Sequence, residues 1–394
     1  MHRGLTSRRT LLRLLSAPVL TGVRLGSAEA RPQRVVIAGA GIIGASIAYH
    51  LAQRGAQVTI LEKQRPGNGA TRNAFAWLNA DKQPQTYYEL NLLGILGWHR
   101  LCNEIGPELQ MQWGGTVRWA RPGDAAAAYR KQVAQYQKWG YPVSLVDQQE
   151  FVRLEPSIKP GAYGAGSFNP LEGTVEPMHA LMVLLHKAQQ FGAKVEYPCE
   201  ATGLDIAGDR VRGVQTTRGP MAADVVVLAS GVDTPKLAQM AGFTVPLRES
   251  AGLLAHTTPQ ARILDRVVLG PGVDIKQDTD GRIVTGVDFG PSSSRDTSPE
   301  SGRKLLANAA QYLEKLKGVP LEFVTLGFRV LPQDGFPIVG FPERRPNLYV
   351  AAMHSGMTMA PIIGQLAATE ILDGVAVDLF APFRLARFSK RSAN

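Results

Sequence analysis

A glycine motif near the start of the chain, GAGIIG at residues 39–44, restricts what the surrounding sequence can fold into. The apolar run 35–38 before it predicts a buried parallel strand, and the apolar spacing of 45–51 after it predicts a helix. A second apolar run, 58–61, ends at an acidic residue, Glu62. Strand, glycine turn, helix, strand and acid in this order predict a nucleotide-binding βαβ unit.

The residues of this unit have separate physical roles. Gly39 allows a tight turn, Gly41 allows the backbone to approach a pyrophosphate, and Gly44 allows the helix to lie against the strand. Unpaired amides and the helix dipole favour a phosphate at the helix N-terminus. Glu62 would accept hydrogen bonds from a ribose and would repel the 2′-phosphate of NADP. The candidate contacts of the turn are Gly39, Gly41, Ile42, Ile43 and Gly44.

The βαβ unit alone leaves both NAD and FAD open, so the choice depends on the rest of the chain. The loop 67–77 is small, polar and contains glycine, and it could run along an extended cofactor and donate hydrogen bonds. The segment 224–231, apolar after its first residue, predicts another buried strand that ends in small residues. These segments add as candidate cofactor contacts Lys63, Thr71, Arg72, Asn73, Ser230 and Gly231.

A second set of motifs lies near the end of the chain. The segment 335–340 precedes the stretch 347–352, which is apolar after Asn347, and a turn at 353–356 follows. A helix is predicted from about Thr358. Such a helix would present the positive end of its dipole to any bound group that gains negative charge beside it. The alternative is a turn that only connects strand and helix.

With both sets of motifs in view, the sequence resembles the FAD-dependent amine and amino-acid oxidoreductases, which include D-amino-acid oxidase, glycine oxidase and sarcosine oxidase. The resemblance covers residues 34–388. It implies FAD as cofactor and an α/β fold with a discontinuous, Rossmann-like FAD-binding domain. A second, α+β substrate domain would carry a mostly antiparallel sheet. The expected FAD-binding segments are 31–90, 165–235 and 325–394, and the expected substrate-domain segments are 91–164 and 236–324.

The resemblance also implies roles for single residues. The glycine turn and Glu62 match the family's pyrophosphate and ribose contacts. Thr71, Arg72 and Asn73 fall in the loop that runs towards the flavin ring. The turn at Ser355 and Gly356 matches the segment near the pyrimidine edge of the flavin, and Met357 and Thr358 follow it.

Arg329 is the charge of most interest for substrate binding, because it stands in the otherwise apolar segment 326–331. A buried arginine needs an anion. In the resembled family the matching arginine binds the substrate carboxylate in a two-pronged contact. The alternatives are a structural ion pair, for instance with Asp334, and a guanidinium in solvent. The sequence departs from many family members because two residues separate Arg329 from Pro332.

The predicted chemistry is removal of a hydride from the carbon beside an amine to flavin N5, which gives an imine. No dedicated base is required, and His354 is a candidate for a direct catalytic part. Lys276 is interpreted either as a promoter of the reaction with oxygen or as a solvated lysine. Candidate aromatic residues of the pocket, for which core packing is the alternative, are Trp77, Tyr163 and Phe336.

Composition restricts the other classes of function. Residues 1–30 contribute +4 of the formal net charge of +10, and the remaining excess is scattered without a nucleic-acid motif, so nucleic acid is not an expected partner. The only two cysteines, Cys102 and Cys199, are too few for a disulfide framework and too far apart for a metal site. Neither lies in a stretch that resembles the family's flavin attachment site, so non-covalent FAD is expected.

The first thirty residues resemble a twin-arginine export signal. Arg8 and Arg9 precede the mostly apolar stretch 14–25, and Ala28-Glu29-Ala30 has the form of a cleavage site. Charges and a proline interrupt the stretch, so no stable membrane anchor is expected. The expected location is the periplasm, or the cytoplasm if this segment is only a basic extension.

The leading functional hypothesis is an FAD-dependent oxidase or dehydrogenase of a small amino acid or secondary amine. A flavin-binding assembly or electron-transfer subunit without its own turnover is the alternative, and an NAD-dependent dehydrogenase is a third. The electron acceptor, whether oxygen, a quinone or a protein, is left open.

Overall fold

The computed structural model describes residues 31–286 and 295–389. Residues 33–394 form one compact unit, and residues 1–32 are grouped separately. The expected export signal at 1–30 lies outside the described residues.

A six-stranded sheet forms the first half of this unit. Its strand order is β21-β22-β13-β1-β2-β9. All neighbours are parallel except the edge strand β21, which runs antiparallel to β22. The strands are β1 Arg34–Ala38, β2 Gln57–Leu61, β9 Lys194–Glu196, β13 Val225–Leu228, β21 Ile338–Gly340 and β22 Leu348–Ala352.

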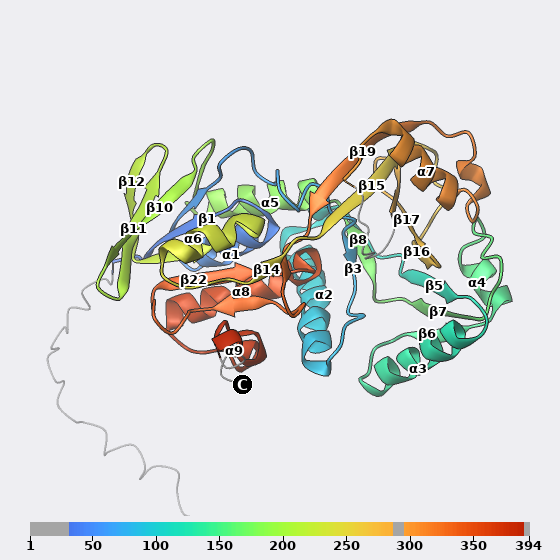
Figure 1. The fold of residues 1–394 in the computed structure, drawn as a ribbon, viewed down its shortest axis with the longest axis horizontal. Coiled ribbons are helices and arrows are strands. Elements are labelled where there is room, and N and C mark those ends of the chain that lie inside the picture. Colours follow the sequence, from blue (N-terminus) through green and yellow to red (C-terminus); the bar gives the residue numbers. More distant parts are fainter. Residues whose placement is uncertain (1–30, 287–294, 390–394) are drawn as a thin grey trace, which may run out of the picture. The chain divides into compact units, whose positions relative to one another are not determined.

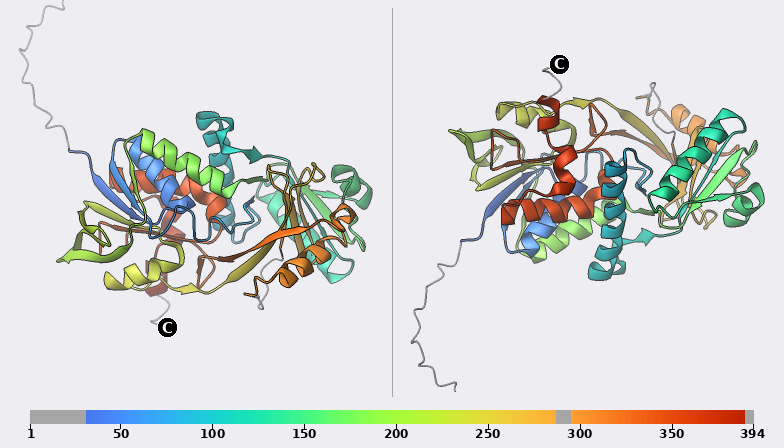
Figure 2. Two further views of the ribbon diagram at one scale, coloured as in Figure 1. Left: turned by 90° about the horizontal axis from the view of Figure 1, so that it is seen from above. Right: turned by 90° about the horizontal axis from the view of Figure 1, so that it is seen from below.

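Both faces of this sheet are covered, which is why its central strands β1, β13 and β22 are almost continuously apolar. In β1, Val35 and Ile37 face one core cluster, whereas Val36 and Ala38 face another. The first face carries three helices that lie side by side in Figure 2. They are α1 Ile42–Gln53, α5 Pro177–Gln190 and α8 Gly356–Asp373.

The second face is covered by a small antiparallel sheet and a short helix (Figure 1). These elements are β10 Ala201–Ala207, β11 Arg210–Thr216, β12 Gly219–Ala222 and α6 Thr234–Met240.

The second half of the unit is built on an eight-stranded sheet with the order β19-β15-β18-β17-β16-β5-β7-β6. Only β16 and β5 pair in parallel, and the other neighbours are antiparallel. The mostly antiparallel second sheet that we expected is therefore confirmed. Its strands are β5 Thr116–Ala120, β6 Ser144–Val146, β7 Ala165–Asn169, β15 Ala251–Thr257, β16 Val267–Gly270, β17 Val273–Gln277, β18 Ile283–Gly286 and β19 Leu321–Phe328.

Helices pack against this sheet over two further core clusters. These helices are α3 Asp124–Lys138, α4 Gln148–Leu154 and α7 Pro299–Ala309. The remaining short elements are β3 Trp77–Leu78, β4 Met111–Gln112, β8 Gly173–Val175, β14 Leu247–Arg248, β20 Leu331–Pro332, α9 Ala386–Ser389 and the 3₁₀ turns Pro107–Leu109, Gly231–Asp233, Glu314–Leu316 and Asp378–Phe383.

Three expected segment boundaries differ from the sheets that form. Strand β7 belongs to the eight-stranded sheet, so this sheet extends past residue 165. Strand β19 belongs to it up to Phe328, beyond the expected boundary at 325. Helix α2, Gln85–Ile105, packs against α8 of the FAD-binding half, and Gly94 allows the close contact because a Cβ there would lie 2.4 Å from the Thr358 oxygen.

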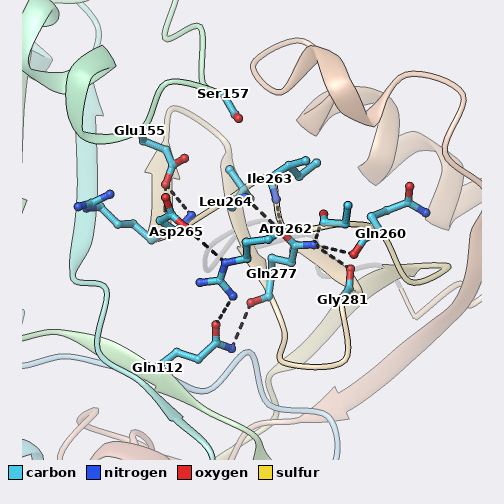
Figure 3. Close-up of polar contacts among 12 residues, drawn as sticks. Gln112, Glu155, Ser157, Gln260, Arg262, Ile263, Leu264, Asp265, Gln277 and Gly281 are labelled. Atoms are coloured by element: carbon cyan, nitrogen blue, oxygen red, sulfur yellow. Dashed lines mark hydrogen bonds and ion pairs between the residues drawn. The ribbon is translucent and has the colours of Figure 1, made fainter.

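A buried glutamine at the end of β17 holds the loop that leads into β16 (Figure 3). The Gln277 Oε1 accepts hydrogen bonds from the amides of Ile263 and Leu264, at 2.8 and 3.1 Å. Its Nε2 donates to the carbonyl oxygens of Ala261 and Gly281. One side chain thus replaces the backbone pairing that this irregular segment lacks.

Candidate active site

The glycine turn has the geometry that its sequence predicted. Gly39 adopts a φ of +110°, and a Cβ there would lie 2.4 Å from the carbonyl oxygen of Ala229. A Cβ on Gly44 would lie 2.0 Å from the carbonyl oxygen of Gly39. Neither position can hold a larger residue without movement of the backbone.

The N-terminus of α1 is arranged to receive an anion. Its N-cap residue, Gly41, supplies no side-chain hydrogen bond to the helix. The amide of Ile42 donates to the Thr71 Oγ1 at 3.1 Å, so the loop after β2 is tied to the helix start. The Glu62 carboxylate accepts from the amide of Ala40 at 3.2 Å, at the end of the neighbouring strand.

A single cavity of about 1320 Å³ extends from this turn to the face of the eight-stranded sheet. Its volume exceeds the ~300–1,000 Å³ of common small-molecule pockets, which suits a dinucleotide together with a substrate. The candidate residues that line it are Gly39, Gly41, Ile42, Ile43, Glu62, Lys63, Thr71, Asn73, Ser230, Gly231, Arg329, His354, Ser355, Gly356, Met357 and Thr358.

Some of the predicted residues do not line this cavity. Gly44 lies behind the turn, where its part is helix packing. Arg72 is exposed and does not line the cavity, so its part as a cofactor contact stays a prediction, whereas its neighbours Thr71 and Asn73 do line the cavity. Among the aromatic candidates only Trp77 lines it. Tyr163 donates to the Val146 carbonyl, and Phe336 packs edge-on against Tyr87.

Lys276 is buried rather than solvated, which corrects one alternative. Its Nζ lies 2.5 Å from the Asp278 Oδ1 and 5.7 Å from the ring centroid of Phe75. Phe75 lines the cavity and Lys276 does not. The ammonium is therefore placed behind an aromatic wall of the site.

Helix α8 begins at Gly356, two residues before the predicted start at Thr358. Ser355 is its N-cap and adopts a left-handed conformation with a φ of +57°. The Ser355 Oγ accepts a hydrogen bond from Tyr87 at 3.3 Å and lies 3.1 Å from the His354 Nδ1. The residues that begin α8 line the cavity. A helix N-terminus has a positive potential, so this part of the cavity favours a group that gains negative charge.

His354 is held in its neutral form. Burial, together with the positive charges of Lys82 and Arg329, lowers its pKa to about 3. A neutral imidazole can exchange hydrogen bonds with a substrate amine without repelling a cation.

Arg329 follows β19 and lines the cavity at the edge of the eight-stranded sheet. Its Nη1 donates to the Ala251 carbonyl at 2.5 Å, and its guanidinium lies over Gly252, where a Cβ would approach it to 2.7 Å. The Asp334 carboxylate, the partner considered in the sequence, accepts two hydrogen bonds from Arg387, at 2.8 and 3.0 Å.

Several polar residues of the cavity were not found from the sequence. They are Asp81, Lys82, Arg118, Tyr129 and Gln132. The one available signal was the alternation of β5, in which Val117 and Trp119 are buried and Arg118 faces the other way. No pattern in the sequence indicated Asp81 or Lys82.

One cavity joins a glycine turn on a parallel sheet to a basic side chain on an antiparallel sheet. This arrangement defines a class of protein that brings a dinucleotide and a small molecule together. The comparisons agree with this class. The chain belongs to the family of FAD-dependent oxidoreductases, the amino-acid and amine oxidases, whose family model DAO (FAD dependent oxidoreductase) matches residues 34–370.

Among curated relatives, the chain is 28% identical to a glycine oxidase of Geobacillus kaustophilus over 90% of this chain and 96% of that protein. It is 26% identical to a glycine oxidase of Bacillus licheniformis, over 86% and 92% of the two chains. Among solved structures, L-proline dehydrogenase from P. horikoshii has the same fold, with a TM-score of 0.84, 23% identity and coverage of 91% and 98%.

Proposed function

We propose that this protein binds FAD non-covalently along the described cavity and oxidises the C–N bond of a small amino acid or secondary amine. The observation that carries the proposal is the continuity of that cavity, from the amides that open α1 to Arg329 and His354. The names of the relatives differ in the amino acid they print, glycine or L-proline, so the substrate has to be argued from this chain's own residues.

The residues present fit FAD. The N-terminus of α1, where Gly41 has no side chain to cap the helix, and the absence of a side chain at Gly39 would accept the pyrophosphate. Glu62 would bind the adenosine ribose, and the start of α8 would face the flavin. Neither cysteine lines the cavity, which supports non-covalent binding.

When bound, FAD supplies a two-electron acceptor for the hydride of the carbon beside the amine. Loss of that hydride leaves an imine, which water hydrolyses. The protein's part is orientation: Arg329 would hold the substrate carboxylate, and neutral His354 would lie beside the amine.

An absorption spectrum and an anaerobic screen test this function. The purified protein should be yellow, with the bands of oxidised flavin. Addition of D- and L-amino acids, N-methyl amino acids and polyamines without oxygen should bleach those bands for at least one class. A colourless folded protein would contradict FAD binding. A yellow protein that no amine bleaches would favour the alternative, a flavin-binding subunit without its own turnover.

We also propose export to the periplasm through the twin-arginine route, supported by the motif at Arg8 and Arg9. In the described part of the chain, no helix combines the length and hydrophobicity needed to span a bilayer. Fractionation of cells that express the full chain and the Arg8→Lys/Arg9→Lys variant tests the route. Only the unaltered chain should reach the periplasm, and retention of both in the cytoplasm would contradict it.

A further inference from the structure

Trp77 lines the cavity where the loop 67–77 meets the start of α8. Its backbone carbonyl lies 3.4 Å from the Oγ1 of Thr358, which is in the first turn of that helix and also lines the cavity. The residue before it, Ala76, has a φ of +58° although it is not a glycine. Such a conformation persists only where the surrounding structure enforces it. The position of Trp77 is therefore imposed by contacts with the rest of the fold.

The polar edge of the Trp77 indole is directed away from the cavity. Its Nε1 donates to the Glu172 Oε2 at 2.8 Å and to the Thr116 Oγ1 at 2.9 Å. Both acceptor residues are only 4% exposed, and neither lines the cavity. Because Nε1 is the only polar atom of the side chain, Trp77 presents an apolar aromatic surface to the cavity.

The same carboxylate also holds the segment that follows Trp77. Glu172 lies in the turn between β7 and β8. Its Oε1 accepts hydrogen bonds from the Tyr141 hydroxyl at 2.5 Å and from the Asn169 Nδ2 at 3.2 Å. The Tyr141 oxygen in turn accepts a hydrogen bond from the amide of Ala80 at 2.9 Å. One carboxylate thus fixes both the indole and the backbone of the segment that follows it.

Stability alone does not explain an acid at position 172. The three donors described above, an indole, a phenol and an amide, carry no charge. Burial raises the pKa of Glu172 to about 7, although the hydrogen bonds from Tyr141 and Trp77 oppose the rise. An uncharged acceptor would cost less to bury. A carboxylate accepts a stronger hydrogen bond than an amide oxygen does, so it orients the indole more firmly.

We propose that Trp77 contacts an apolar group of the substrate and that Glu172 is the positioning residue that sets the orientation of this contact. The inference rests on the proposed function, because it assigns a specificity-determining residue to that same site. The substrate class is then an amino acid or secondary amine that carries an alkyl or larger apolar substituent. An indole that is held before the substrate arrives loses little entropy on contact, so each methylene that it covers adds to the affinity.

The test uses the yellow holoprotein and two sulfur analogues that have no amine to oxidise. (Methylthio)acetate and (propylthio)acetate share the carboxylate and differ only in the length of the alkyl group. Each is titrated while the perturbation of the flavin bands is recorded. We expect the propyl analogue to bind about tenfold more tightly, since one buried methylene is worth roughly fourfold in affinity. Equal affinities would overturn the inference, and so would flavin bands that neither analogue perturbs.

Substitution of Trp77 tests the contact itself. Trp77→Phe keeps a ring but has no N–H that Glu172 can hold, so the preference for the propyl analogue should fall below about threefold. The affinity for (methylthio)acetate and the flavin content should change little. An unaltered preference in Trp77→Phe would overturn the role of Glu172. Loss of flavin with an unaltered preference would place Trp77 against the cofactor and would also overturn the inference.

A double-mutant cycle shows whether Glu172 acts through Trp77. Glu172→Leu should lower the preference to the level of Trp77→Phe, whereas Glu172→Gln keeps an acceptor oxygen and should retain most of it. In the Trp77→Phe background, Glu172→Leu should change the preference less than about twofold, and additive effects would contradict the assignment. As a matched control, Glu155→Leu removes a buried carboxylate outside the cavity and should leave the preference intact. Trp77→Phe and Glu172→Gln decide the question on their own if Glu172→Leu does not fold.

The same preparation separates failure of this inference from failure of the proposed function. A protein that amines bleach but that binds both analogues equally would keep the oxidase function and overturn the apolar contact at Trp77. A yellow protein that no amine bleaches would remove the oxidase function and, with it, the substrate that this inference names.

Discussion

Arg329 shows how one residue can be placed by the backbone before any ligand arrives. Its Nη1 donates to the Ala251 carbonyl, and its guanidinium lies over Gly252, so its orientation does not depend on a substrate. Such an orientation lowers the entropy lost when a carboxylate binds.

We predict that Arg329→Ala raises KM for a carboxylate-bearing substrate about 100-fold, because truncation of one partner of a charged hydrogen-bonded pair typically costs ~2–5 kcal/mol. The flavin content should not change. Steady-state kinetics and the ratio of protein to flavin absorbance measure the two effects. Arg329→Lys should fall between the unaltered protein and Arg329→Ala, since it keeps the charge but loses the fork. Loss of flavin with an unchanged KM would place Arg329 in cofactor binding instead.

Glu155 affects how the free energy of unfolding depends on pH. Its Oε2 accepts hydrogen bonds from the amides of Asp265 and Arg266, at 3.1 and 3.0 Å (Figure 3 shows Glu155 and Asp265). Burial raises the pKa of Glu155 to about 7, and nearby Asp265 adds to the rise. The folded protein therefore keeps a proton that the unfolded chain releases near pH 4.5. The free energy of unfolding falls as the pH rises through that window and is level above pH 7.

We predict that Glu155→Gln flattens this dependence, because the amide oxygen can accept the same two bonds without ionising. Urea unfolding at pH 5 and pH 8 should show a loss for the unaltered protein that exceeds the loss for Glu155→Gln, by on the order of 1–3 kcal/mol. Glu172 and Glu176 also have a pKa raised to about 7 by burial. Both residues are present in the unaltered protein and in Glu155→Gln, so they add equally to the two losses and do not affect the difference between them. Glu104→Gln, at an exposed position, should behave like the unaltered protein.

At the scale of elements, Glu370 joins three parts of the FAD-binding half. It is buried within α8 and accepts hydrogen bonds from the Tyr349 hydroxyl of β22 and from the Val377 amide, both at 2.8 Å. Arg384, in the segment that follows the last 3₁₀ turn, donates to both of its oxygens. The carboxylate therefore fixes the C-terminal segment to the helix and the sheet.

We predict that Arg384→Met lowers the free energy of unfolding by about 3–5 kcal/mol, because it leaves a buried charge without its cation. Denaturant unfolding at pH 7 measures the change. Arg54→Met removes an exposed ion pair with Asp373, which lies on α8 as Glu370 does. This change should lower the free energy of unfolding by less than ~1 kcal/mol. The double variant Glu370→Gln/Arg384→Met should recover part of the loss. A small effect of Arg384→Met alone would mean that water reaches Glu370.

The same scale explains what the sequence could predict. The βαβ unit was predictable because strand, turn and helix are set by neighbours a few residues apart. The partner of β7 was not, since its membership of the second sheet depends on pairing with β5, far away in the sequence. Thr71 and Arg72 were predicted together, but the turn directs one towards Ile42 and the other into solvent. Local patterns also carry no sign of Lys82, which donates to Asn79, a residue that in turn contacts the start of α8.

At the scale of the whole compact unit, both sheets contribute to one cavity, and that coupling has a thermodynamic consequence. A ligand that binds only the folded chain stabilises it by RT ln(1 + [L]/Kd), so its effect grows with concentration. Because the parallel sheet, the antiparallel sheet and the start of α8 all line the cavity, FAD would stabilise both halves together.

We predict that removal of FAD lowers the melting temperature and that added FAD restores it, with about 1.4 kcal/mol gained for each tenfold excess over Kd. Differential scanning calorimetry over a range of FAD concentrations gives the slope of the melting temperature against FAD concentration. Gly39→Ala should abolish this slope, since a Cβ there meets the Ala229 carbonyl at 2.4 Å and forces the turn out of its conformation. Gly203→Ala has only ordinary contacts, at 3.5 Å, and lies outside the cavity, so it should keep the slope. A melting temperature independent of FAD in the unaltered protein would show that the cavity does not bind the dinucleotide, whatever the stability of the fold.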